Sequence, residues 1–203
     1  MELLSAPITL TLVVITVITS LRGFQDSDLM YKFMFTPYRI AQDLREEWSR
    51  FFSHGLIHAD GMHLAFNMIA LYSFGGIVES MLGSSRFLLL YLFSLLTSGL
   101  PDYFTHRNNP GYRALGASGA VSAILLSAVI FDPFISVSLF FLPGIPGWIF
   151  ALLYMGYSFY ASRYAQDNIG HNAHLWGAVS GIVLTLLMEP SQLGYLIRIV
   201  QGG

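Results

Sequence analysis

The sequence contains no cysteine, and charged residues make up only 11% of its 203 positions. The absence of cysteine excludes disulfide bonds, a thiolate nucleophile and any cysteine-ligated metal. The shortage of charge is equally informative, because a soluble domain carries roughly 25% charged residues. The formal net charge of -2 provides no positive field for binding a nucleic acid.

Apolar residues make up 54% of the chain, and its mean hydropathy is +0.59. A transmembrane helix needs about 20 mostly apolar residues. On this criterion the sequence predicts an all-α membrane protein, a compact bundle of six transmembrane helices in one domain that covers 1–203, with no separate soluble domain. The first apolar run lacks a basic flank and a cleavage site, so we expect it to be retained. The predicted spans are about 5–22, 61–82, 86–105, 117–132, 147–164 and 171–189.

Two connections between the predicted spans are unusual. The long polar segment 23–60 carries scattered aromatic side chains, which favour the headgroup region of a bilayer. We therefore expect it to form an interfacial loop on the membrane surface. The apolar stretch 134–146 is interrupted by proline and glycine, so we expect a broken, half-buried loop there.

Polar side chains inside the predicted spans are few. Such groups are costly in lipid, usually face the interior of the bundle and often mark function. The informative ones are His63, Asn67, Glu79, Ser118, His171 and His174.

Ser118 lies between two glycines, Gly116 and Gly119, at the start of an apolar run. Considered alone, this is typical of small residues that allow close helix packing. The Gly-x-Ser-x-Gly elbow of soluble hydrolases does not fit, because residue 120 is alanine and no strand is expected before the serine. A serine becomes nucleophilic only beside a base.

His174 could supply that base. It shares a helical face with Gly177 and Gly181, whose lack of side chains would let another helix approach closely. If that helix is 117–132, imidazole and hydroxyl come within hydrogen-bond reach. His171 is an alternative base without paired glycines on its face. A single intramembrane histidine can also be no more than an interhelical hydrogen bond.

His63 and Asn67 are spaced i, i+4 and share one helical face. Their side chains are both hydrogen-bond donors, as an oxyanion hole requires, where one donor contributes about 2.7–4 kcal/mol. A polar pair that only packs two helices is the alternative interpretation.

Other chemistries of the histidines are less favoured. His54, His58 and His63 could bind a metal or haem, but the His-Glu-x-x-His pattern is absent. A proton-relay transporter would show an inverted repeat or paired broken helices, and the sequence has neither. We therefore expect no metal and no cofactor.

Six short motifs occur together in a fixed order across residues 50–182. In this order they resemble the rhomboid family of intramembrane serine proteases. The motifs are His54-Gly-Leu-Ile-His58, His63-x-x-x-Asn67, Gly75-Gly76-x-x-Glu79, Gly83-Ser84, Gly116-Ala117-Ser118-Gly119 and Ala173-His174-x-x-Gly177-x-x-x-Gly181.

The resemblance implies a serine endopeptidase that cleaves transmembrane segments of membrane proteins within the lipid bilayer. Ser118 would be the nucleophile and His174 the base, in a dyad without a third acid. His63, Asn67 and the backbone N–H of Ser118 would stabilise the oxyanion. A relative that binds transmembrane clients without catalysis is the alternative, but it would not need both Ser118 and His174.

The resemblance also implies supporting roles. Glu79 would tie helices together, His58 would line the cavity, and Gly116, Gly119, Gly177 and Gly181 would allow close packing. Bacterial members often stack a tyrosine, one turn after the serine, on the catalytic imidazole. Ser122 occupies that position here, so the packing around His174 must differ.

The expected location is a bacterial plasma membrane, as a multi-pass protein. Eight of the ten Lys and Arg residues lie in the first, third and fifth loops, which the positive-inside rule places in the cytoplasm. The resemblance instead places the first loop and the active site on the extracytoplasmic side. We follow the resemblance, because acidic residues interleave the basic residues of the first loop.

Overall fold

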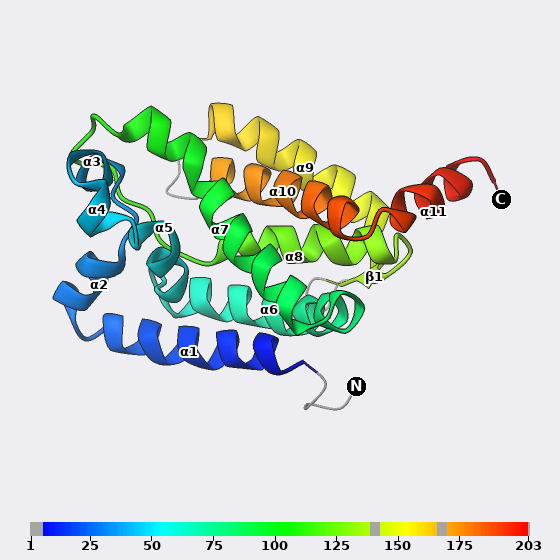
Figure 1. Cartoon of the computed structure of the whole chain (residues 1–203), viewed down its shortest axis with the longest axis horizontal. Helices are drawn as coiled ribbons and strands as arrows, with labels where there is room; N and C mark the ends of the chain where they lie inside the picture. The colour runs from blue at the N-terminus through cyan, green and yellow to red at the C-terminus, as the bar shows by residue number, and fades with distance from the viewer. Residues whose placement is uncertain (1–5, 139–142, 166–169, 203) are drawn as a thin grey trace.

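The computed structural model describes residues 6–138, 143–165 and 170–202, and this part of the chain is mainly helical (Figure 1). Six long helices occupy the segments expected to span the membrane. They are α1 (Pro7–Gly23), α6 (Gly61–Leu82), α7 (Ser84–His106), α8 (Ser118–Phe131), α9 (Gly147–Tyr164) and α10 (His171–Met188).

Shorter elements connect these helices. The segment expected to form an interfacial loop folds into α2 (Ser27–Phe33), α3 (Pro37–Gln42), α4 (Leu44–Glu47), α5 (Arg50–Ser53) and the 3-10 helix η2 (His54–Leu56). The two-residue strands β1 (Ser136–Val137) and β2 (Ile145–Pro146) pair antiparallel in the proline- and glycine-interrupted stretch, of which 139–142 lie outside the described residues. Helix α11 (Ser191–Val200) follows α10 at a bend of 110°.

Helix length and composition test how many segments could cross a membrane. Among the described residues, α6 and α7 are long and apolar enough, and a third span results if α10 and α11 together count as one. Helices α1 and α8 are apolar but shorter. The expected count of six spans is therefore not confirmed by this criterion.

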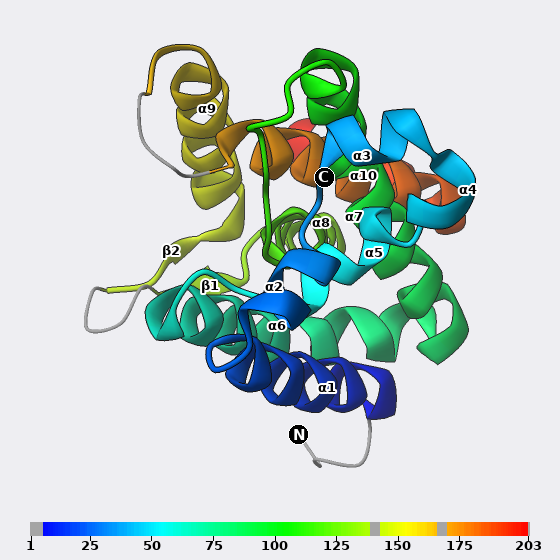
Figure 2. The same cartoon turned by 90° about the vertical axis from the view of Figure 1, so that its left-hand side faces the viewer.

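Helix α8 lies in the middle of the bundle. Figure 2 looks nearly along it, with α6 below, α10 above, α9 to the left and α7 to the right. From Gly119 to Val129 every residue of α8 is buried. Apolar side chains of α6 and α7, including Leu71 and Leu90, form one buried cluster with Ile124 of α8. The first residue of α8, Ser118, thus sits on the most enclosed helix of the fold.

The outer surface is apolar and the interior contains hydroxyl groups. Large apolar side chains such as Ile69, Leu89 and Leu187 are exposed on the outer faces of α6, α7 and α10, whereas Ser127 and Thr185 are fully buried and joined by a 2.7 Å hydrogen bond. This arrangement suits a bilayer, where lipid covers the apolar faces and polar groups bond between helices.

Glu79 joins three helices. Its carboxylate accepts hydrogen bonds from the backbone N–H groups of Ile8 and Thr9 at the start of α1, at 3.0 and 2.8 Å. It also accepts from the hydroxyls of Thr9 and Ser84, at 2.9 and 2.6 Å, and the side chain is buried. Because N–H groups in the first turn of a helix lack intrahelical acceptors, the carboxylate caps α1 while it holds α6 and α7.

We expect Glu79→Gln to lower the free energy of unfolding by about 3 kcal/mol, because a carboxamide loses the charge and turns an NH2 group toward donors. Thermal unfolding in detergent measures the change. Glu189→Gln is the matched control, since Glu189 pairs at 2.6 Å with Arg86 at a largely exposed site. Such surface pairs contribute about 0–1 kcal/mol. Equal unfolding temperatures for the two variants would contradict the capping role.

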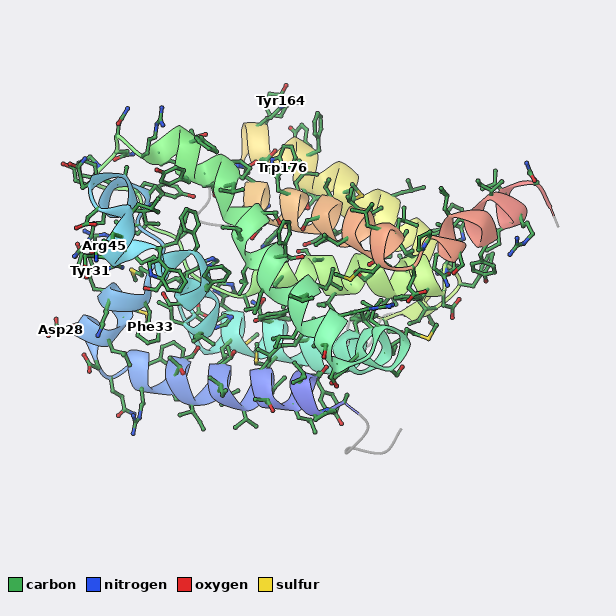
Figure 3. All side chains as sticks on the ribbon, viewed as in Figure 1. Asp28, Tyr31, Phe33, Arg45, Tyr164 and Trp176 are labelled. Carbon is green, nitrogen blue, oxygen red and sulfur yellow. The ribbon has the colours of Figure 1, made fainter. Side chains whose placement is uncertain are left out.

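Arg50 holds the short helices together. Its guanidinium is buried, donates to the carbonyl oxygens of Tyr31 and Met34 at 2.8 Å each, and pairs with Glu47. Burial raises the pKa of Glu47, but hydrogen bonds from Arg50 and Arg39 outweigh burial and lower it overall. Tyr31 and Arg45 lie at the end of the molecule that these helices form (Figure 3). The N-terminal ends of α8 and α10 face the same end (Figure 1).

Candidate active site

The turn before Ser118 requires glycine at position 116. Gly116 has φ +113°, a conformation that side-chain-bearing residues rarely adopt. A Cβ there would also lie 2.7 Å from Cε1 of the His63 ring. The N–H of Gly116 donates to the carbonyl oxygen of His54 at 2.9 Å. Gly116 thus allows the His63 ring to lie against the backbone two residues before Ser118.

His58 fixes the next residue of the turn. The backbone N–H of Ala117 donates to its Nε2 at 3.3 Å, so Nδ1 carries the proton and donates to Ser20 Oγ at 3.1 Å. Ser20 in turn donates to the carbonyl oxygen of Leu56 at 3.1 Å. Burial lowers the pKa of His58 to about 3, which keeps the ring neutral and able to accept.

Ser118 is the first residue of α8 and is only partly buried. Because it lies in the first turn, its backbone N–H has no intrahelical acceptor. The positive end of the helix dipole also lies at this residue. The backbone therefore offers a donor suited to an anion directly beside the Ser118 hydroxyl.

Helices α8 and α10 touch through their backbones. A Cβ on Gly177 would overlap the carbonyl oxygen of Gly119, and one on Gly181 would overlap Ala123. A Cβ on Gly119 would in turn lie 3.4 Å from the carbonyl oxygen of Ala173. The neighbours of Ser118 and His174 are thus in direct contact, as the glycine face of 174, 177 and 181 predicted.

The structure gathers His58, His63, Gly116, Ser118 and His174 at one end of the bundle. Within the described part of the chain, no hydrogen bond joins Ser118 Oγ to His174, and the two side chains lie on neighbouring helices. Such bonds often form only when substrate is bound. The contact between α8 and α10 places Ser118 and His174 near the point where the two helices cross.

Asn67 is arranged differently from His63. Its side chain is buried, and its Nδ2 donates to the carbonyl oxygen of His63 at 2.9 Å. One amide hydrogen of Asn67 is thus used within its own helix. The second hydrogen of the NH2 group remains for an anion.

Asp102 makes polar contacts near the site that the sequence analysis did not predict. This buried carboxylate of α7 accepts from Tyr112 Oη at 2.9 Å and from Asn172 Nδ2 at 2.6 Å. Burial and the Asp102 carboxylate raise the pKa of the Tyr112 phenol, so Tyr112 remains a donor. Tyr112 precedes Ser118 in the chain and Asn172 precedes His174, so Asp102 ties together the two segments that carry them. A cavity of about 330 Å³ lies beside Asp102 and His171.

Tyr154 of α9 is an aromatic neighbour of His174. The two rings are nearly parallel, with centroids 6.4 Å apart and planes inclined by 22°. Its Oη lies 2.5 Å from Ser122 Oγ. The packing around His174 therefore differs as expected from serine at position 122, because the neighbouring tyrosine comes from α9 instead of α8. The only hint in the sequence was the serine itself.

Comparison with known proteins gives consistent matches. A family described as Rhomboid domain matches residues 45–191. The Rhomboid protease GlpG of Haemophilus influenzae is 32% identical over 162 residues, which cover 79% of this chain and 78% of that protein. The Rhomboid protease GluP of Bacillus subtilis is 34% identical over 135 residues, 66% of this chain but only 25% of that protein.

Proposed function

The chain belongs to the rhomboid family of intramembrane serine proteases, and we propose that Ser118 is its nucleophile and His174 its general base. The observation that carries this proposal is the backbone contact between Gly119 and Gly177. It sets a hydroxyl and an imidazole on adjoining helix turns. The proposed catalytic pair consists of these two residues and includes no carboxylate.

In the proposed reaction, Ser118 Oγ attacks the carbonyl carbon of a peptide bond while a ring nitrogen of His174 accepts its proton. The tetrahedral intermediate then collapses, and His174 gives the proton to the leaving amine. Water next attacks the acyl-enzyme with His174 again as base. This step releases the new carboxyl terminus and restores the serine.

The developing oxyanion has three candidate donors. The Ser118 N–H lacks an intrahelical acceptor, the His63 ring touches Gly116, and Asn67 has a free amide hydrogen. His58 contributes indirectly, since its bond to Ala117 holds the turn that aims the Ser118 N–H. Donors fixed before reaction stabilise the transition state without reorganisation.

The substrates we propose are transmembrane segments of membrane proteins, cleaved where the helix can unwind near one membrane face. Water must reach the site, and the polar residues at the starts of α6, α8 and α10 suit a wet cavity open at that face. We further propose that all six long helices span the membrane and that the chain forms one domain with segment 23–60 at the surface. The location would be a bacterial plasma membrane, with the site on its extracytoplasmic side.

An activity-based serine reagent tests the dyad. A fluorophosphonate probe should label the wild-type protein in detergent micelles, and both Ser118→Ala and His174→Ala should abolish labelling because they remove the nucleophile or its base. Ser80→Ala is the matched control, since Ser80 is exposed and, among the described residues, its hydroxyl bonds only within α6. Persistent labelling of Ser118→Ala, or none of the wild type, would refute the proposal and leave the client-binding alternative.

A further inference from the structure

Among the described residues, the His174 ring has two aromatic neighbours, and they meet it at different angles. His171 meets it edge-on, with centroids 6.0 Å apart and planes at 86°. Tyr154 lies face-to-face and offset, at 6.4 Å and 22°. Phe150, one turn earlier on α9, stacks on the Tyr154 ring at 5.5 Å and 16°. The imidazole therefore lies beside the stacked rings of Tyr154 and Phe150 of α9.

A chain of hydroxyls connects the same tyrosine to the nucleophile's helix turn. Ser122 Oγ donates to the carbonyl oxygen of Ser118 at 2.7 Å, which uses its only hydrogen. Tyr154 must then be the donor in its 2.5 Å bond to Ser122 Oγ. Tyr154 thus holds the turn that carries Ser118 while its ring faces His174.

We propose that Tyr154 is a positioning residue for His174, and that Ser122 holds Tyr154 in place. An imidazole turns freely about its last side-chain torsion unless a neighbour restrains it. The offset tyrosine ring restricts that torsion, and the bond to Ser122 fixes the tyrosine relative to Ser118. Tyr154 of α9 thus contacts both Ser122 of α8 and His174 of α10. The positions of the serine turn and of the imidazole are therefore set by the same tyrosine. This inference rests on the proposed dyad.

The residues at 122 and 154 have complementary sizes. A small hydroxyl at 122 leaves room for the tyrosine from α9 and supplies its acceptor. The outward face of α9 is otherwise exposed, as at Leu152, Leu153 and Tyr160. Tyr154 is half-buried on the face toward α8 and α10.

Cleavage of a transmembrane substrate in proteoliposomes tests the proposal through kcat and KM. We expect Tyr154→Leu to lower kcat about tenfold, the factor that one aromatic contact supplies, with KM unchanged. Tyr154→Phe and Ser122→Ala both keep the ring and both remove the bond between Tyr154 Oη and Ser122 Oγ, so each should give a loss smaller than that of Tyr154→Leu. Tyr160→Leu removes an exposed tyrosine from the same helix and should match the wild type.

Each outcome decides a separate point. Wild-type kcat in Tyr154→Leu, or an equal loss in Tyr154→Phe and Tyr154→Leu, would overturn the positioning role. If Tyr154→Leu does not fold, Tyr154→Met, which keeps side-chain bulk without a ring, replaces it under the same criteria. Ser118→Ala is measured alongside. If it is inactive while Tyr154→Leu is fully active, only the positioning role fails, whereas an active Ser118→Ala overturns the dyad as well.

Discussion

Replacing His174 with alanine is expected to slow cleavage of a transmembrane substrate by about 10³- to 10⁶-fold, because a serine without its base is a poor nucleophile at neutral pH. Cleavage in proteoliposomes, followed by the appearance of product, measures this loss. KM should change little, since the imidazole acts in the chemical step rather than in binding. Thermal unfolding should also change little, because the His174 ring makes no side-chain hydrogen bond among the described residues and the residue as a whole is only partly buried.

His171→Ala is the matched control, because the sequence left His171 as an alternative base. The structure places His171 one turn earlier, buried beside a polar cavity, with its ring edge-on to Tyr157 at 5.5 Å. The helix contact at Gly119 instead lies beside Ala173 and Gly177, which flank His174. We therefore expect His171→Ala to retain at least a tenth of the wild-type rate. A reversed order of the two variants would assign the base to His171.

The sequence predicted the parts of the site that depend on local spacing. Gly177 and Gly181 share a face with His174 because residues three and four apart are neighbours on a helix. That spacing predicted a close approach by another helix and left 117–132 as a candidate, and the structure has this contact with α8 at Gly119 and Ala123. The ends of the long helices were predictable for a similar reason, since proline and polar residues interrupt the apolar runs.

Contacts between distant segments could not be predicted in this way. Tyr154 reaches Ser122 across 32 positions of sequence, and Asp102 reaches Asn172 across 70. No periodicity within either helix signals such a pair. The surface segment is similar, since buried Arg50 orders its short helices through carbonyl oxygens up to 19 positions away. Charge and aromatic content predicted a surface location for this segment but no internal structure.

Helix α8 is missed by a criterion based on helix length and apolar composition. Helix α8 has only 14 residues and is too short for the criterion that α6 and α7 meet. Yet it is the most enclosed helix, so protein rather than lipid surrounds it. A buried helix needs to match its neighbours rather than the thickness of a bilayer. Apolar length therefore does not identify the helix that carries Ser118.

Gly177→Ala is expected to destabilise the fold by about 3 kcal/mol or more, at the upper end of the range for overpacked cores. Its added Cβ would overlap the carbonyl oxygen of Gly119, a backbone atom in a buried helix that no rotamer change can move. Helices α8 and α10 would have to separate, and the separation would carry His174 away from Ser118. Thermal unfolding in detergent measures the destabilisation, and fluorophosphonate labelling at a temperature below the transition measures the separation.

Gly156→Ala is the control for the helical preference of alanine. Gly156 lies within α9, and apart from the adjacent backbone of α9 itself no atom of the described residues lies within 4 Å of the Cβ that alanine would add there. Alanine stabilises a helix by roughly 0.5–1 kcal/mol relative to glycine, so this variant should unfold at the same temperature as the wild type or higher. A Gly177→Ala protein that unfolds like Gly156→Ala and labels at the wild-type rate would show that the helices can separate without cost. The backbone contact would then not be what brings the serine and the histidine together.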